Sequence, residues 1–265
     1  VEFLVDEKTK EFWFLEVNTR LQVEYPVTEE VTGIDLVKEQ LRIASGEELG
    51  YDQIDIDFFG SSIEVRLYAE DPGNDFLPVT GKMIAFEPTD DPLVRWDVGI
   101  ESGSNITSNF DPMLAKIISF GETRIEAANK LALALENSHF GGMKTNRDYL
   151  VSILRSKEYL DGDTTTDFIE RVNLKSDIDL TQEEITSYAK VGAMWIQGKN
   201  RNEAMVLKNI QSGWNNGRLP HQEVRLLHNE DELKVKYRSL KNGDFISEFD
   251  ESIRIFDWSM DFIDL

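Results

Sequence analysis

Two hydrophobic periods alternate along this chain, and this alternation constrains its fold more than any other feature. Residues 62–69 place Ile63, Val65 and Leu67 at every second position, which is the pattern of a half-buried strand. After Thr123-x-x-Glu126, by contrast, apolar residues follow helical spacing behind a capping-box start. Because strand-like and helix-like segments both recur, the sequence predicts an α+β fold.

The first residues predict a β-hairpin. Residues 1–5 and 12–17 are rich in aromatic and β-branched residues and flank the polar turn 7–10. A turn centred on Thr9 would place Glu2 directly opposite Glu16. Two facing carboxylates repel one another unless a cation lies between them, so the hairpin favours a cation site.

Capping-box patterns predict where the following helices begin. Thr32-x-x-Asp35 predicts a helix that ends before Gly46 and packs on a sheet. Thr123-x-x-Glu126 and Thr145-x-x-Asp148 predict two more helices, joined through the turn at 141–142. The apolar residues expected on the buried faces are Ile34, Val37, Leu41 and Ala44 in the first helix and Ile125, Ala128, Leu131 and Leu135 in the second.

A polar stretch between about residues 161 and 180 predicts a boundary in the chain. Beyond it, Thr181-x-x-Glu184 begins a helix that is expected to continue through Asn202 to Ser212. Period-two runs around 224–228, 233–237 and 253–255 then predict a small antiparallel, β-barrel-like domain.

Composition excludes several kinds of site and partner. The 50 acidic residues outnumber the 28 basic ones, and the resulting charge of −22 repels nucleic acid. No apolar run is long enough to span a bilayer, so no membrane partner is expected. With no cysteine there are no disulfides or thiolate metal sites, which fits a reducing compartment. The start at Val1, without Met or a signal peptide, predicts a fragment of a longer protein.

Histidine and tryptophan residues carry weaker signals. His139, His221 and His228 are far apart and lack metal-ligand spacing, so any metal is expected on oxygen ligands. The tryptophans Trp195, Trp214 and Trp258 are expected to pack in a core.

The segment 16–24 places a polar residue at every second position. While it stays extended, these side chains project from one face, as in any half-exposed strand. Their types are more informative, because carboxylates, amides and a guanidinium together hold a hard cation and orient a small anion beside a base. Glu2, Glu16 and Asn18 would suit Mg²⁺ or Mn²⁺, although an exposed hairpin with screened glutamates remains the alternative.

The run FLEVNTRLQVEYPVTE at residues 14–29 closely resembles the signature of biotin carboxylase, the ATP-grasp component of biotin-dependent carboxylases. The resemblance covers roughly the first 170 residues. It continues through the segments GIDLVKEQLR (33–42), EVRLYAEDP (64–72), FLP (76–78), TGK (80–82), DPMLAK (111–116) and KTN (144–146).

This resemblance implies a role for each site residue. Glu2, Glu16 and Asn18 would bind the metals of MgATP, and Leu4 would lie near the adenine. A further set would bind the other substrates: Arg20, Gln22 and the Val23 backbone for bicarbonate, Glu24 as the base that deprotonates it, and Arg66 at the biotin ureido oxygen. ATP and bicarbonate would then form carboxyphosphate, which carboxylates biotin held on a carrier domain. Without the resemblance, Arg66 is more simply a surface strand charge.

The resemblance also implies a domain order. Residues 1–50 would be the C-terminal part of an ATP-grasp domain and 51–175 the biotin carboxylase C-terminal domain. Residues 176–265 look like the linker domain of α subunits of the propionyl-CoA and methylcrotonyl-CoA carboxylase kind, which docks on a carboxyltransferase β subunit and precedes a biotinyl domain. The family's first half, with its glycine-rich lid, is missing, so we expect the fragment alone to be inactive.

Two departures stand inside the resemblance. Tyr25 occupies a position where the family usually has His, and we expect it to support the neighbouring backbone. Residues 105–110, near the family's dimer surface, also differ, although the full-length protein is expected to form an oligomer.

The family implies the cytoplasm, or the mitochondrial matrix in a eukaryote. Another ATP-grasp ligase and a non-catalytic, subunit-docking fragment remain as alternatives, although the RLQVE run at 20–24 argues against the former.

Overall fold

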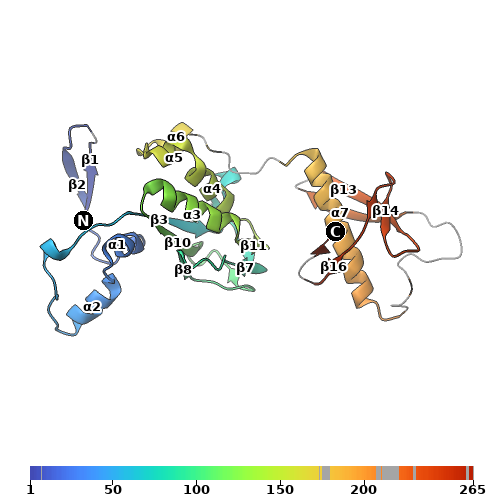
Figure 1. Ribbon diagram of the computed structural model, residues 1–265, viewed down its shortest axis with the longest axis horizontal. Helices are drawn as coiled ribbons and strands as arrows, with labels where there is room; N and C mark the ends of the chain where they lie inside the picture. The colour runs from blue at the N-terminus through green and yellow to red at the C-terminus, as the bar shows by residue number, and fades with distance from the viewer. Residues whose placement is uncertain are drawn as a thin grey trace. The chain divides into compact units, whose positions relative to one another are not determined.

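The computed structural model describes residues 1–6, 8–172, 174, 180–206, 210, 221–228, 231–260 and 263–264. The chain divides into two compact units, Val1–Ile178 and Asp179–Leu265 (Figure 1). Within the described residues, no helix is both long enough and apolar enough to cross a bilayer.

The N-terminal hairpin forms, and its predicted register holds at Glu2 only, because a register shift between Glu2 and Phe3 places Phe3 opposite Phe14 and not Leu15. Strands β1 (Glu2–Val5) and β2 (Phe12–Glu16) pair antiparallel, with Glu2 opposite Glu16. The prediction that the chain stays extended through Glu24 is wrong, because β2 ends at Glu16 and helix α1 (Tyr25–Thr32) begins nine residues later. Pro26 in the first turn of α1 explains this start, since its fixed φ suits a helix N-terminus.

The helix predicted from Thr32 starts later than expected. Thr32 ends α1, and Gly33 follows in the left-handed conformation with φ +71°. Asp35 is the cap of α2 (Leu36–Ala44), because its carboxylate accepts the Lys38 N–H. No residue of α2 is buried, and Leu41 is 65% exposed, so the predicted packing of this helix on a sheet is not observed in the described residues.

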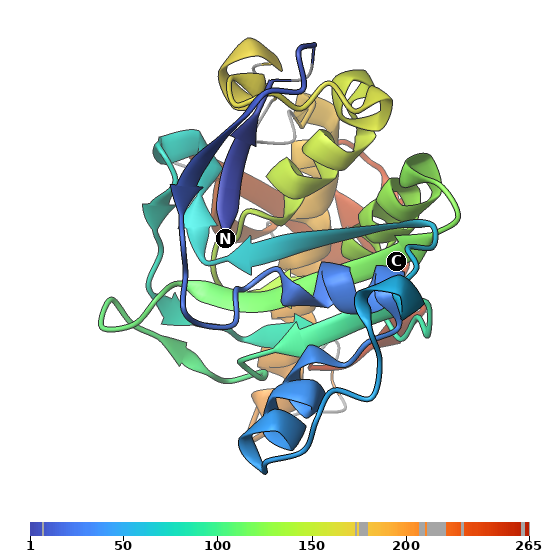
Figure 2. The same ribbon diagram turned by 90° about the vertical axis from the view of Figure 1, so that its left-hand side faces the viewer.

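The core of the first unit is a three-stranded antiparallel sheet. Its order is β3 (Ser61–Tyr68), β10 (Met113–Gly121) and β8 (Val94–Val98). The alternation predicted for β3 is confirmed, since Ile63, Val65 and Leu67 are all buried. These residues pack in one cluster with α3 (Arg124–Glu136), while α1 contacts the other face of the sheet (Figure 2).

The sequence predicts helix starts at Thr123 and Thr145, and the first of them is confirmed. Thr123 caps α3 by accepting the Glu126 N–H at 3.2 Å. Helix α4 (Arg147–Arg155) instead has Asn146 at its cap position, and the Asn146 side chain is occupied with the backbone of β3. Ile125 is 52% exposed, although Ala128, Leu131 and Leu135 form the predicted buried stripe of α3.

The other elements of the first unit are short and line the edges of this core. Strand β11 (His139–Gly141) lies between α3 and α4 and pairs with β7 (Ala85–Glu87). The rest are η1 (Gln53–Asp55), β4 (Glu70–Asp71), η2 (Pro72–Asn74), β5 (Leu77–Pro78), β6 (Gly81–Lys82), β9 (Asn105–Ile106), α5 (Lys157–Asp161) and α6 (Phe168–Val172).

The second unit packs one long helix on an antiparallel sheet. Helix α7 (Gln182–Glu203) starts with the predicted capping box at Thr181 and ends at Glu203, short of Ser212, which lies outside the described residues. The sheet order follows the chain, and a two-stranded ladder follows it. These strands are β12 (Gln222–His228), β13 (Asp231–Ser239), β14 (Phe245–Ser247) and β15 (Ser252–Ile253), then β16 (Asp257–Trp258) and β17 (Ile263–Asp264).

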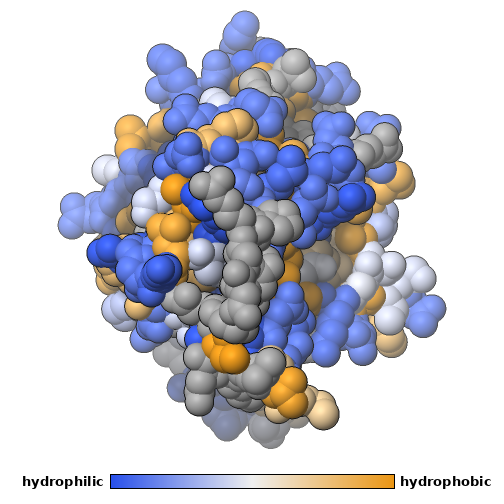
Figure 3. Space-filling view, turned by 90° about the vertical axis from the view of Figure 1, so that its right-hand side faces the viewer, coloured by the Kyte–Doolittle hydropathy of each residue, from blue (hydrophilic) through white to orange (hydrophobic). Residues whose placement is uncertain are grey.

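This sheet is open in the described residues, so the barrel-like closure predicted from the sequence is not observed there. Trp258 donates its ring N–H to the Trp195 carbonyl at 3.1 Å, and the two rings are partly exposed and lie outside the buried cluster of this unit, whereas Trp214 lies outside the described residues. Among the residues that Figure 3 colours, most are hydrophilic, and the hydrophobic ones form small separate groups.

Candidate active site

The predicted metal ligands form a hydrogen-bonded cluster at the base of the hairpin. The Asn18 amide N–H groups donate to Glu2 Oε1 at 2.8 Å and to Glu16 Oε1 at 2.9 Å. Gln22 donates a further hydrogen bond to Glu2 Oε1 at 2.5 Å. Amide hydrogens therefore lie between the two carboxylates, in the place where the sequence predicts a cation.

The donor set fits a hard cation with few protein ligands. Mg²⁺ and Mn²⁺ take carboxylate and amide oxygens, often only one or two carboxylates together with substrate phosphates. Asn18 would offer its amide oxygen after a rotation of the side chain, since the two ends of an amide have nearly the same shape. The described residues contain no group of three His, Cys, Asp or Glu side chains that holds a metal alone. Glu2, Glu16 and Asn18 therefore suit a metal that brings ligands of its own.

The predicted base and the predicted biotin partner form an ion pair. Arg66 Nη2 lies 2.7 Å from Glu24 Oε2, and the two side chains are 41% and 51% exposed. Strand β3 positions Arg66 on the face opposite its buried aliphatic residues, and the start of α1 brings Glu24 to that face. This pair joins two residues that are distant in sequence at one accessible point.

Lys116 of β10 holds the backbone beside Glu24. Its ammonium donates to the Val23 carbonyl at 3.2 Å, lies 3.1 Å from Asp97 Oδ2 and stands 4.4 Å from the centre of the Tyr25 ring. The backbone support predicted for Tyr25 is thus provided by Lys116, and Tyr25 contacts that cation through its ring. Sequence reasoning missed Lys116, and the signal for it was a single cation inside the otherwise apolar run 113–118.

Arg95 of β8 links α1 to the same face of the sheet. Its guanidinium contacts Glu29 Oε2 at 2.7 Å and Asp97 Oδ1 at 3.0 Å. Burial alone would raise the pKa of Asp97, but hydrogen bonds from Arg95 and Lys116 bring that pKa below its ordinary value. Asp97 is therefore ionised at neutral pH and anchors both cations.

Glu64 is a buried carboxyl next to the Glu24–Arg66 pair. Its side chain is 4% exposed, and its Oε1 lies 3.9 Å from Arg66 Nε. Burial raises the pKa of Glu64 to about 7; the charges of Lys116 and Arg66 lower it, and those of Glu24 and Asp97 raise it. Sequence reasoning placed Glu64 only on the polar face of β3, and burial on that face follows from packing between elements and has no signal in the strand sequence.

The predicted bicarbonate residues are divided among different contacts. Gln22 joins the carboxylate cluster through Glu2, and Val23 is held by Lys116. The Arg20 guanidinium donates to the Leu21 carbonyl at 3.3 Å. Leu4, predicted near adenine, is 50% exposed on β1. The structure therefore brings Glu2, Glu16, Asn18 and Gln22 together, and separately Glu24 with Arg66.

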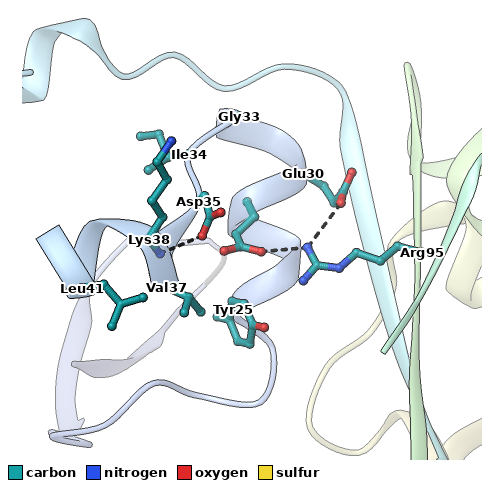
Figure 4. Close-up of a pocket in the computed structure, with 10 residues that line it drawn as sticks. Tyr25, Glu30, Gly33, Ile34, Asp35, Val37, Lys38, Leu41 and Arg95 are labelled. Carbon is teal, nitrogen blue, oxygen red and sulfur yellow. Dashed lines mark hydrogen bonds and ion pairs between the residues drawn. The ribbon is translucent and has the colours of Figure 1, made fainter. Parts of the chain in front are cut away.

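A pocket of about 720 Å³ lies beside α1 and α2 (Figure 4). Tyr25 and Arg95 line it, and Arg95 reaches Glu29 and Glu30 there. Figure 4 shows Val37 and Leu41 of α2 on the opposite side of the pocket. None of the residues predicted to bind metal, bicarbonate or biotin lines this pocket.

Comparison with known proteins identifies two regions. Residues 64–171 match the model of the biotin carboxylase C-terminal domain, and residues 1–51 match the ATP-binding domain of the carbamoyl-phosphate synthase L chain. The chain is 48% identical over 171 residues to biotin carboxylase 2 of Bacillus subtilis, and this match covers 64% of the chain and 38% of that protein. It is 45% identical over 174 residues to the mitochondrial propionyl-CoA carboxylase alpha chain of Sus scrofa, covering 65% of the chain and 24% of the relative.

A solved structure agrees with these matches. The biotin carboxylase domain of the Hydrogenobacter thermophilus 2-oxoglutarate carboxylase, crystallised with MgADP, ADP and bicarbonate, superposes with a TM-score of 0.63 at 40% identity. That match covers 64% of this chain and 38% of the other. Residues 64–171 are therefore similar to a biotin carboxylase C-terminal domain and residues 1–51 to part of an ATP-binding domain, and the chain spans less than half the length of the relatives it matches, which include biotin carboxylases and alpha chains of acyl-CoA carboxylases.

Proposed function

We propose that the complete gene product carrying this sequence is the biotin carboxylase component of a biotin-dependent acyl-CoA carboxylase. It would use ATP and bicarbonate to carboxylate biotin on a carrier domain through carboxyphosphate. The observation that carries this proposal is the contact between Glu24 and Arg66 at 2.7 Å, which puts a base beside a guanidinium on one accessible face. The relatives named biotin carboxylase support it.

Glu24 and Arg66 divide the chemistry between them in this proposal. Bicarbonate is a poor nucleophile until it loses its proton, and the Glu24 carboxylate is the group that accepts this proton. The Arg66 guanidinium donates hydrogen bonds to the ureido oxygen of biotin and stabilises the negative charge that develops there. Lys116 keeps the Val23 backbone, which we assign to the bicarbonate site with Arg20 and Gln22, in a fixed position.

Nucleotide binding is assigned to the hairpin. Glu2, Glu16 and Asn18 would hold Mg²⁺ or Mn²⁺ together with the ATP phosphates, and Leu4 would contact the adenine. The metal would neutralise phosphate charge during attack on the γ-phosphate. For this, the Asn18 amide turns its oxygen toward the two carboxylates that its N–H groups now contact.

We assign residues 1–50 to the ATP-grasp domain, 51–175 to the biotin carboxylase C-terminal domain and 176–265 to a linker domain that docks on a carboxyltransferase β subunit. The full-length protein would also meet a biotinyl carrier domain and form an oligomer. We assign it to the cytoplasm, or to the mitochondrial matrix in a eukaryote, because several relatives are mitochondrial.

Another ATP-grasp ligase is the second candidate, favoured by the match of residues 1–51 to a carbamoyl-phosphate synthase domain. The synthesis of carbamoyl phosphate does not involve biotin, so it does not need a guanidinium at a ureido oxygen. Dependence of product formation on free biotin therefore separates the two candidates.

The test replaces Glu24 by Gln in the complete gene product. Glu24→Gln keeps the size of the side chain but removes its basicity, so bicarbonate-dependent ATP cleavage with free biotin should fall at least about 100-fold. Nucleotide affinity should stay within about twofold. Glu122→Gln, which changes an exposed carboxylate, is the matched control and should retain full activity. Wild-type turnover in Glu24→Gln would refute the assignment of the base.

A further inference from the structure

Glu64 lies in the layer of charged residues between α1 and the central sheet. It precedes Arg66 by two positions on β3, so both side chains project to the same face of the strand. Its Oε2 is buried and has no hydrogen-bond partner among the described residues. A buried polar atom without a hydrogen-bond partner lowers the stability of the folded protein. Each such atom in a native structure calls for an explanation, and a role in catalysis is one of them.

Four charged groups surround this carboxyl. Arg66 of β3, Lys116 of β10, Asp97 of β8 and Glu24 at the start of α1 all influence it. Lys116 is already bound to Asp97 and to the Val23 carbonyl. Arg66 is also bound to Glu24, but its Nε lies within ion-pair distance of Glu64, 3.9 Å from Glu64 Oε1.

Arg66 thus stands between two carboxyl groups of different character. Glu24 contacts it at 2.7 Å and is 51% exposed, whereas Glu64 lies 3.9 Å from it and is 4% exposed. In the proposed function, Glu24 takes a proton from bicarbonate and so loses the negative charge that holds the guanidinium. Arg66 must keep its position during this change, because the ureido oxygen of biotin has to meet it.

We propose that Glu64 is a positioning residue that holds the Arg66 guanidinium in place while Glu24 changes its protonation state. This inference rests on the proposed function. The negative charge of Glu24 is one of the causes that raise the pKa of Glu64. Once Glu24 is neutral, Glu64 releases its own proton to water more readily, and Arg66 retains an anionic partner.

The first test needs no catalysis. Carboxyl ¹³C NMR of this chain would follow the titration of Glu64, assigned by the loss of its signal in Glu64→Gln. In Glu24→Gln the titration midpoint of Glu64 should fall by at least about half a pH unit, because a neighbouring negative charge is removed. Glu122→Gln should leave the midpoint unchanged. An unchanged midpoint in Glu24→Gln overturns the proposal, whether or not the proposed function holds.

The second test uses the complete gene product. Glu64→Gln resembles the protonated acid at every pH, so kcat/KM for biotin should stay within about twofold of wild type at pH 6 and fall about tenfold below it at pH 8. A purely structural role would lower the rate by the same factor at both pH values, and that result contradicts the proposal. Absence of bicarbonate-dependent ATP cleavage in the wild type would instead count against the proposed function. In that case the NMR titration alone would show whether Glu64 responds to the charge of Glu24.

Discussion

The Glu24 carboxylate and the Arg66 guanidinium lie 2.7 Å apart although 42 positions separate them in the chain. Both side chains are about half exposed, and exposed ion pairs contribute only about 0–1 kcal/mol to stability. The pair therefore adds little to the free energy of folding. The pair instead brings a base and a hydrogen-bond donor to one point on the surface.

Replacing Arg66 by Lys tests the donor. The ammonium keeps the charge but loses the planar set of N–H groups that can serve Glu24 and a ureido oxygen together. We expect kcat for carboxylation of free biotin by the complete gene product to fall about 100-fold, with ATP affinity within about twofold of wild type. Arg155→Lys, at an exposed pair with Glu136, is the control. An Arg66→Lys enzyme with normal kcat would exclude the proposed role.

The pH dependence of stability tests the burial of Glu64. Its pKa is about 7 in the folded protein and near 4.5 in the unfolded chain, so the folded protein binds more protons between these values. The free energy of unfolding therefore falls as pH rises from about 4.5 to about 7. Urea denaturation of Glu64→Gln should show a gain of about 2 kcal/mol over wild type between pH 5 and pH 8. Parallel curves for the two proteins would show that Glu64 titrates normally.

Lys116→Met tests the support of the Val23 backbone. The substitution leaves Asp97 with one cation fewer and frees the Val23 carbonyl, and removing one partner of a largely buried pair costs about 3 kcal/mol. Chemical denaturation should measure this loss. Lys157→Met removes an ion pair to Asp161 at a lysine that is 82% exposed, and it should cost less than about 0.5 kcal/mol. Equal losses in the two variants would contradict the special role of Lys116.

Glu16→Gln tests the metal site. Because Gln lacks the negative charge of a carboxylate, the Mg²⁺ concentration that half-saturates ATP cleavage by the complete gene product should rise about tenfold or more. Glu11→Gln changes an exposed carboxylate of the same hairpin and serves as the control. An unchanged Mg²⁺ requirement in Glu16→Gln would remove this residue from the metal site.

Several features of this protein follow from short stretches of sequence alone. The pairing of Glu2 with Glu16, the buried face of β3 and the helix starts at Thr123 and Thr181 all agree with prediction. Each depends on neighbours within one strand, turn or helical turn, where side-chain period and backbone hydrogen bonding leave few choices. The resemblance to the biotin carboxylase signature at residues 14–29 is likewise local to one stretch of sequence.

Other features were decided only by tertiary packing. The strand β2 ends at Glu16, Pro26 lies in the first turn of α1, and the contact of that helix with the sheet sets Glu24 against Arg66 beside the buried Glu64. Lys116 reaches Val23, 93 positions earlier in the chain, through the same contact. Distances between side chains from separate elements, and the pKa values that depend on burial, have no local signature, because they depend on which surfaces exclude water together.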